Sequence, residues 1–475
     1  MGLLSNTKWI GLSQGFKILV QLLSMVVLAR LIPPDEYGLM AMALVVVNLA
    51  MLIRDLGTSA AIIQRKELLD KTINAIFWLN VFMGGIVCLF VVVTSPVVAF
   101  LFHQEKLILV LCLISLSFPL GSSSATHLAL LERQSKFRKV ALIEVSSSLV
   151  SFIAAVSMAL MGYGVLSLVI QILVLNLLST IQLWHASDWR PSLKKIWDIN
   201  ELKNIFGFSA NLTFFNFINY FSRNVDSMII GHYMSANILG AYSLAYRVML
   251  FPLQSLTFVA SRALFPILSQ YQDDPEKTRK VYSDVIYYIL IIVMPLMLGV
   301  AVLSKEFVLI VFGDKWMLTS DILIWLAPTA IIQSVLSTSG TIFMSKGRTD
   351  TLMLLGVIGA ILQVSAFLIG VKFGIIIFAQ LYFLANVINL FPVMFFVFRL
   401  TGLSSLLVLK KIAPIFISSV GVFIVVSYVK FYSSISFTMF YSFILSVLSG
   451  IIAYAVMIII LDKQLRSIML KVFQR

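Results

Sequence analysis

Long apolar stretches, separated by short polar segments, recur from one end of the chain to the other. A stretch of 18 or more apolar residues is long enough for an α-helix to cross a hydrocarbon core about 30 Å thick. Prolines lie inside or beside several stretches, which favours bent or broken helices in the membrane. The pattern predicts an all-α polytopic membrane protein with fourteen spans, near residues 9–31, 39–63, 75–102, 107–131, 140–161, 164–185, 208–231, 238–263, 284–304, 319–344, 351–371, 374–398, 411–430 and 437–461.

The composition supports a membrane protein. Of the 475 residues, 60% are hydrophobic and 12% are charged, whereas soluble domains carry about 45–50% apolar and about 25% charged residues. The net charge of +14 does not indicate nucleic-acid binding, because no soluble segment carries a basic region interleaved with aromatic residues. Cys88 and Cys112 lie within apolar spans and indicate no disulfide framework.

The distribution of lysine and arginine predicts the orientation. With the fourteen spans in place, twenty-four Lys and Arg residues lie on the side of the N-terminus and five lie on the opposite side. Cytoplasmic loops are enriched in Lys and Arg. We therefore expect an even number of spans, with both termini in the cytoplasm. Arg30, Arg54 and Arg262 lie near span ends, where we expect them to snorkel to the interface.

Two parts of the chain show weak internal similarity. At an offset of 202 residues, segment 30–43 aligns with segment 232–245 and places Gly38 on Gly240; a second match occurs at an offset of 210. An offset of six spans gives both halves the same orientation, which is typical of parallel-repeat transporters. We therefore predict two six-helix lobes followed by two extra spans. The expected divisions are an N-lobe at 1–186, a linker at 187–207, a C-lobe at 208–400, and the two further spans with a cytoplasmic tail at 401–475.

The segment between the predicted lobes carries apolar residues at helical spacing among Lys and Asp. Ile196, Ile199 and Leu202 are examples. This pattern is typical of an amphipathic helix that lies on the membrane surface. A plain linker is the alternative.

Polar side chains interrupt the seventh span and lie on one face of the predicted helix. They follow an i, i+3, i+7, i+10 pattern: Asn216, Asn219, Arg223 and Asp226. The offset of 202 residues places a second polar stripe on the first span, made of Gln14, Lys17, Gln21 and Ser24. Further groups from the second and eighth spans are expected to complete the walls of a cavity: Asn48, Asp55, Tyr242, Tyr246 and Arg247.

Energetics argue against exposure of these groups to lipid. A charged side chain at the middle of a membrane helix costs about 2.5–3.5 kcal/mol. The predicted walls contain four charged residues: Lys17, Arg223, Asp226 and Arg247. Together they would cost roughly 10–14 kcal/mol against lipid, comparable with the whole stability of many proteins. Three of the four are cations, so we predict a water-accessible cavity of positive potential between the lobes. The alternative is that Arg223 and Asp226 pair with each other and only lock helices together.

Motifs for chemistry or for ATP hydrolysis are absent from the sequence. It contains no G-x-x-x-x-G-K-[ST] loop, no H-E-x-x-H and no G-x-S-x-G. Its four histidines form no pattern typical of metal ligands, and no cofactor is expected. The loops on the outer side are short, which argues against an enzyme. The pattern favours a secondary transporter that works by alternating access.

Five segments resemble one known family: "LARLIPPDEYGLMAMA" (28–43), "DLGTSAAIIQRKEL" (55–68), "LGAYSLAYRV" (239–248), "LFPILSQYQDDPEKTRKVY" (264–282) and "VFGDKW" (311–316). The chain is similar to the polysaccharide-transport branch of the multidrug/oligosaccharidyl-lipid/polysaccharide (MOP) exporter superfamily. Within that branch it resembles the lipopolysaccharide and colanic-acid exporter group, the Wzx-type flippases. The resemblance implies a bacterial inner-membrane protein that carries undecaprenyl-diphosphate-linked oligosaccharides to the periplasmic leaflet, with a polymerase and a chain-length regulator as possible partners.

This cargo suggests roles for the polar groups. A diphosphate suits arginine, whose fork matches phosphate oxygens, so Arg223 and Arg247, together with Lys17, are expected to hold it. Asp226 or Asp55 is expected to bind a coupling proton or sodium ion. Sugar hydroxyls are expected to contact Gln21, Asn216, Asn219, Tyr242 and Tyr246.

Three alternatives remain. A drug exporter of the same superfamily generally has an acidic cavity and twelve spans. A lipid II flippase shares the fold and a cationic cavity, so only substrate assays distinguish it. A membrane polymerase or ligase of polysaccharides is disfavoured by the repeat and the short outer loops.

Overall fold

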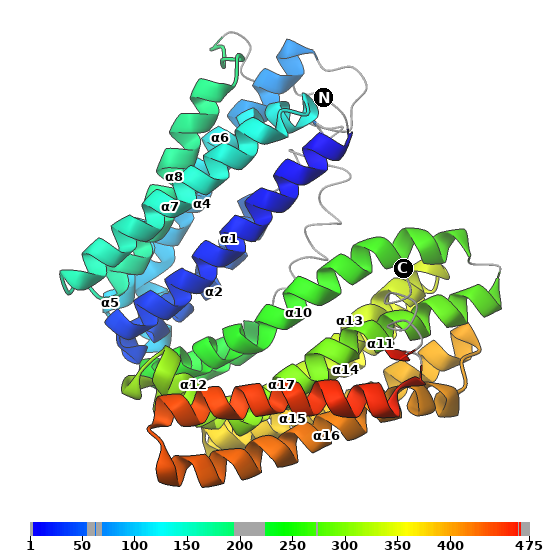
Figure 1. Cartoon of the computed structure of the whole chain (residues 1–475). Helices are drawn as coiled ribbons and strands as arrows, with labels where there is room; N and C mark the ends of the chain where they lie inside the picture. The colour runs from blue at the N-terminus through cyan, green and yellow to red at the C-terminus, as the bar shows by residue number, and fades with distance from the viewer. Residues whose placement is uncertain are drawn as a thin grey trace. The chain divides into compact units, whose positions relative to one another are not determined.

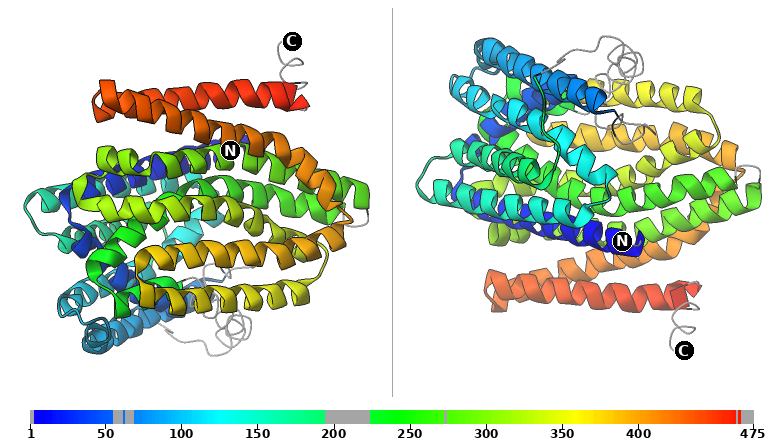
Figure 2. Two further views of the ribbon diagram at one scale, coloured as in Figure 1. Left: turned by 90° about the horizontal axis from the view of Figure 1, so that it is seen from below. Right: turned by 90° about the horizontal axis from the view of Figure 1, so that it is seen from above.

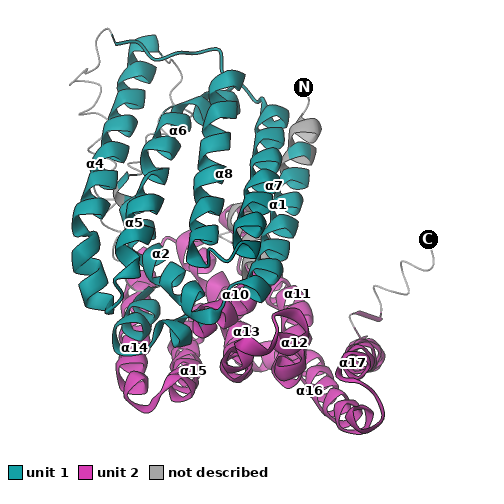
Figure 3. Cartoon of the chain, turned by 90° about the vertical axis from the view of Figure 1, so that its left-hand side faces the viewer, with its two compact units in different colours: residues 1–240 teal, residues 241–475 magenta. Residues whose placement is uncertain are grey.

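The computed structural model is built of helices joined by short connections (Figure 1). It describes residues 3–54, 62, 69–193, 224–271, 274–463 and 465–466. The chain divides into two compact units, residues 1–240 (unit 1) and 241–475 (unit 2), which Figure 3 shows in two colours. Each unit is described by itself.

Unit 1 is a bundle of long helices. Helix α7 packs against both α1 and α8, and α4 packs against α5 and α6; Figure 1 shows α1, α7 and α8 running alongside one another. The helices are α1 (Leu3–Leu31), α2 (Pro34–Arg54), α4 (Asp70–Phe102), α5 (Lys106–Ser115), α6 (Ser117–Arg133), α7 (Phe137–Leu160), α8 (Val165–Ala186) and the first turn of α10 (Ala236–Gln270).

The fourth predicted span is interrupted, as its proline suggested. Helix α5 ends at Ser115 and α6 begins at Ser117, with Leu116 between them. Pro119 lacks a backbone N–H, and a proline ring collides with the carbonyl group four residues earlier, which belongs here to Ser115. The Leu116 N–H instead donates to the carbonyl oxygen of Leu113 at 3.2 Å, one residue closer than in an α-helix.

Glu36 joins the ends of three helices in unit 1. Its Oε1 accepts a hydrogen bond from Lys106 Nζ at 3.1 Å, at the start of α5, and its Oε2 accepts one from the Val165 N–H at 3.0 Å, at the start of α8. The first N–H groups of a helix have no intrahelical partner, so a carboxylate stabilises that end. Gly164 precedes Val165 with φ +54°, a left-handed value that favours glycine.

Unit 2 is built around α11. This helix packs against α13 and α16, while α13 packs against α15, and α15 against α14. Tyr282, Tyr287 and Phe343 are among the fully buried side chains of its core. The helices that follow α10 are α11 (Pro275–Val302), α12 (Ser304–Val311), η1 (Asp314–Trp316), α13 (Met317–Ser345), α14 (Thr349–Gly370), η2 (Val371–Phe373), α15 (Ile375–Thr401), α16 (Ser405–Ser436) and α17 (Met439–Leu461).

The last two helices pack on each other through small residues. Figure 2 shows α16 and α17 side by side at one edge of unit 2. The face of α17 that is buried carries Ser442, Ser446 and Gly450, spaced four residues apart. The Ser442 hydroxyl lies 2.6 Å from that of Ser433 on α16. Small residues let membrane helices approach closely where lipid supplies no hydrophobic driving force.

Twelve helices in the described part of the chain are long and apolar enough to cross a membrane. Each corresponds to one of the fourteen predicted spans, which confirms an all-α polytopic membrane protein. Of the two remaining spans, 208–231 lies largely outside the described residues, and 238–263 lies on α10. The predicted lobe boundaries remain a prediction, because most of the linker and the start of the C-lobe lie outside the described residues.

The first turns of α2 and α10 cross backbone to backbone within unit 1. A Cβ atom on Gly38 would overlap the carbonyl oxygen of Ala236, and a Cβ atom on Gly240 would overlap that of Pro34. The contact is reciprocal: the offset of 202 residues that relates Gly38 to Gly240 also relates Pro34 to Ala236. A two-fold relation produces such paired contacts. The crossing therefore supports the alignment on which the predicted repeat rests.

Replacing Gly240 by valine tests the crossing. We expect Gly240→Val to lower the free energy of unfolding by at least about 1–3 kcal/mol, the usual cost of overpacking, because a backbone carbonyl cannot move aside as a side chain can. Thermal unfolding of the purified protein in detergent measures the change. Gly85→Val in α4 is the control, since a Cβ atom there meets nothing within 4 Å. Equal melting temperatures for the two variants would contradict the crossing.

Candidate functional site

Lys17, one of the predicted cavity residues, forms an ion pair inside unit 1. Its Nζ lies 2.9 Å from Oε1 of Glu144 on α7, and the two side chains are 31% and 33% exposed. A carboxylate beside the ammonium group reduces the large cost of holding either charge within the membrane. The positive potential expected from Lys17 is therefore partly neutralised by Glu144.

Sequence reasoning missed Glu144, although the signal was present. Glu144 is an acidic residue within the predicted fifth span, 140–161. Exposing a carboxylate to lipid costs free energy, as exposing an ammonium group does. Glu144 therefore needs a polar partner for the same reason as Lys17. The predicted cavity walls came from the first, second, seventh and eighth spans and did not include the fifth.

Ser24, further along the same stripe of α1, is also bound within unit 1. Its hydroxyl accepts a hydrogen bond of 2.8 Å from Gln171 Nε2 on α8. Gln182, also on α8, accepts from Ser146 at 2.8 Å and donates to Ser147 at 3.3 Å, both on α7. By contrast, the side chain of Gln21 is exposed. The stripe therefore divides into groups that join α1, α7 and α8 and groups at the surface of unit 1.

Arg54, which was expected to snorkel to the interface, lies close to two other helices of unit 1. It lies at the end of α2, and its Nη1 would be 2.9 Å from a Cβ atom placed on Gly121 of α6. The Oδ1 of Asn176 on α8 would be 3.4 Å from the same point. The guanidinium group thus lies over α6, next to an amide of α8. The absence of a side chain at Gly121 makes room for it.

The predicted residues near the start of α10 have different environments. Tyr242 is buried in unit 2, where its ring stacks on that of Tyr246 at 5.8 Å and meets the edge of Phe378 at 5.7 Å. Arg247, five residues after Tyr242, is exposed. Asp226 is buried in unit 1, and its Oδ1 accepts a hydrogen bond from the Ser227 N–H at 2.7 Å. The four predicted residues outside the described part of the chain are Asp55, Asn216, Asn219 and Arg223.

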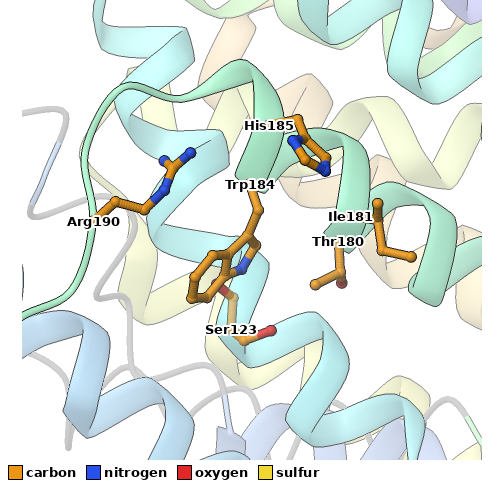
Figure 4. A pocket seen from close by; sticks show the side chains of 6 residues that line it. All are labelled: Ser123, Thr180, Ile181, Trp184, His185 and Arg190. Carbon is orange, nitrogen blue, oxygen red and sulfur yellow. The ribbon is translucent and has the colours of Figure 1, made fainter.

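A cavity of about 470 Å³ lies in unit 1 between α6, α8 and the segment after α8 (Figure 4). Thr180 and Trp184 of α8 donate hydrogen bonds to carbonyl oxygens of α6, at 3.0 and 3.1 Å. Asn176 (which lies beside Arg54), Thr180 and Trp184 follow one another at intervals of four residues, so all three lie on one face of α8. Sequence reasoning did not single out this face.

The cavity combines a cation, hydroxyl groups and an aromatic ring. Arg190 Nη1 donates to the carbonyl oxygens of Ser187 and Trp189, at 2.5 and 2.7 Å, which fixes its guanidinium group at the cavity. Ser123 and Thr180 supply the hydroxyl groups, and the Trp184 ring lies between the arginine and the threonine (Figure 4). Such a set suits a ligand that carries both negative charge and hydroxyl groups.

Behind the cavity, His127 packs as an aromatic residue. Its ring lies 4.7 Å from that of Trp184 and 5.6 Å from that of Trp189. It is fully buried, and neither ring nitrogen has a hydrogen-bond partner among the described residues. In the described ranges, no three His, Cys, Asp or Glu side chains lie close enough together to hold a metal ion.

The Lys17–Glu144 pair makes a prediction about stability. Glu144→Gln leaves the Lys17 ammonium group without its carboxylate, so we expect a lower melting temperature, with a coupling of about 1 kcal/mol between the two sites. Because each side chain is about a third exposed, the effect is smaller than the roughly 3–5 kcal/mol for a buried pair. The double variant Lys17→Met/Glu144→Gln removes both charges and should melt above the single variant. Strictly additive changes would show that the two charges do not interact.

The fold matches that of a membrane protein of known structure. The lipid II flippase MurJ, in an inward closed conformation, matches 96% of this chain and 99% of its own, with a TM-score of 0.75 and 17% sequence identity. An identity this low shows the fold alone. The chain therefore shares the all-helical, polytopic fold of that protein.

The sequence comparisons identify the family. Residues 27–321 match the family model described as polysaccharide biosynthesis protein. The lipopolysaccharide biosynthesis protein WzxC of Escherichia coli (strain K12) is 30% identical over 77% of this chain and 75% of its own length. The teichuronic acid biosynthesis protein TuaB of Bacillus subtilis (strain 168) is 25% identical over 73% of this chain and 72% of its own. The chain belongs to the polysaccharide biosynthesis protein family, which confirms the predicted polysaccharide-transport branch.

Proposed function

We propose that the chain is a flippase that moves an undecaprenyl-diphosphate-linked oligosaccharide across the bacterial inner membrane. The observation that carries the proposal is its family, whose members include proteins named for lipopolysaccharide and teichuronic acid biosynthesis. The fold match to a named lipid II flippase supports movement of a lipid-linked cargo rather than catalysis. The charge distribution supports cytoplasmic termini and transport towards the periplasmic leaflet.

Arginine side chains supply the charge for the diphosphate in this proposal. Arg223 and Arg247 have the strongest claim, because the charge of Lys17 is shared with Glu144. Arg54 joins them as a second-span cation that turns towards α6. The sugar hydroxyls contact Gln21, Asn216, Asn219, Tyr242 and Tyr246, all of which bear hydrogen-bonding groups.

Transport proceeds by alternating access and is coupled to protons or sodium ions through Asp226 or Asp55. The burial of Asp226 supports its role, because an ionisable group inside a membrane helix is a candidate for ion binding. The sequence offers no nucleotide-binding loop as an alternative source of energy.

The diphosphate assignment predicts slow transport without Arg247. In proteoliposomes loaded with an undecaprenyl-diphosphate oligosaccharide, we expect Arg247→Ala to reduce the flipping rate about tenfold or more, since a hydrogen bond to a charged group contributes about 1.5–3 kcal/mol. Arg348→Ala is the matched control, because that guanidinium already pairs with Asp350 at 3.1 Å. A full rate for Arg247→Ala would remove Arg247 from the site. Lipid II in parallel vesicles distinguishes the two lipid-linked cargoes.

The coupling assignment predicts altered ion dependence. We expect Asp226→Asn or Asp55→Asn to abolish the dependence of flipping on the proton or sodium gradient, because an amide does not exchange a proton or balance the charge of a cation. Flipping rates are measured with each gradient imposed in turn. If both variants keep the dependence of the unmodified protein, neither aspartate couples transport to the ion.

A further inference from the structure

A second cavity, of about 370 Å³, lies in unit 2 between the first turns of α11 and the first turns of α16. Helix α11 contributes Arg279 and Lys280, and α16 contributes Leu407 and Lys411. The cavity therefore lies where the last two helices of the chain meet the helix at the centre of unit 2. None of the residues proposed above for transport lines it.

Two of its cations have no carboxylate partner among the residues that the structure describes. Arg279 and Lys280 are exposed, and neither forms an ion pair within the described part of the chain. Nε of Arg279 donates only to the backbone oxygen of Pro275, at 3.2 Å. The charges opposed to them are Glu276, which lines the cavity, and Asp284, which is already paired with Lys411.

Lys411 is fixed where it lines the cavity. Besides Asp284, its Nζ donates to the hydroxyl of Ser283 at 3.1 Å and lies 5.6 Å from the centre of the Tyr287 ring. These contacts tie α16 to α11, and the charge of Lys411 is shared with Asp284.

The beginning of α16 adds a favourable dipole. This helix starts at Ser405, and the side chain of its N-cap residue, Ser404, makes no capping hydrogen bond. The N-terminal end of a helix carries a partial positive charge and attracts phosphate groups. Leu407 lies in the first turn of α16, so this end of the helix borders the cavity.

Leu407, which lines the cavity, is exposed, as are two of its neighbours in the first turns of α16. Leu406, Leu407 and Leu409 on α16 are 58%, 63% and 64% exposed. In a membrane-spanning helix such leucines face acyl chains. The cavity thus offers phosphate-binding groups directly beside an apolar surface, the combination by which basic pockets between membrane helices hold lipid headgroups.

We propose that the cavity between α11 and α16 binds an anionic phospholipid of the surrounding leaflet. Arg279 and Lys280 bind the phosphodiester at the start of α16, and the leucine face of α16 contacts the acyl chains. Such a lipid holds α16 and α17 against α11, a role separate from the transported cargo. The proposal does not depend on which substrate the protein flips.

Native mass spectrometry of the purified full-length protein tests this proposal. The probes are dioleoyl-phosphatidylglycerol and dioleoyl-phosphatidylcholine, which share acyl chains and differ in net charge. We expect the anionic lipid to bind more tightly, and Arg279→Gln/Lys280→Gln to weaken its binding on the order of tenfold. The matched control, Lys315→Gln/Lys372→Gln, removes two exposed charges from other positions in unit 2 and should bind as the unmodified protein does.

Four results would overturn the proposal. Equal affinity for the two lipids would show that charge does not select the ligand, and equal loss in both double variants would show a non-specific effect of net charge. Displacement of phosphatidylglycerol by stoichiometric undecaprenyl phosphate would assign the cavity to the cargo. Leu407→Glu provides an independent check: its carboxylate should repel the headgroup, and unchanged phosphatidylglycerol binding would place the lipid elsewhere.

Discussion

Hydrocarbon offers no hydrogen-bond partner to a charged side chain. This constraint explains why the polar side chains described in unit 1 pair with one another. Lys17 and Glu144 join α1 to α7 by an ion pair, and Ser24 and Gln171 join α1 to α8 by a hydrogen bond. Exposing any of these four side chains to lipid would cost free energy. The same contacts that satisfy these groups also fix three helices in a bundle.

Small residues supply the second means of association. The crossing of α2 and α10 brings backbones together at Gly38 and Gly240, and α17 meets α16 through Ser446 and Gly450. Lipid tails are as apolar as leucine, so helices in a membrane gain little from burying leucine and more from close approach. The exposed leucines of these helices are therefore compatible with stable packing.

The distribution of cations connects the fold to the cargo of its family. Lys17 is neutralised within its own unit, whereas Arg247 is exposed on α10. A diphosphate-linked lipid requires groups whose charge is not already balanced by a neighbouring carboxylate. In the proposed function, Lys17 organises the helices, and Arg223 and Arg247 engage the anion. Lipid phosphate is recognised again, for a structural purpose, where Arg279 and Lys280 meet the start of α16.

The sequence by itself determined the class of protein, twelve spans that match described helices, and the family, because the length and hydrophobicity of a span are local properties. It also placed Gly38 opposite Gly240 in an alignment, without indicating that their backbones touch. Only the tertiary structure decided which polar groups meet. Glu144 is 127 residues from Lys17 in the chain, and Asn176 lies 122 residues from Arg54. Contacts over such separations depend on how helices pack and rotate against one another, which the hydrophobic pattern of a single span does not specify.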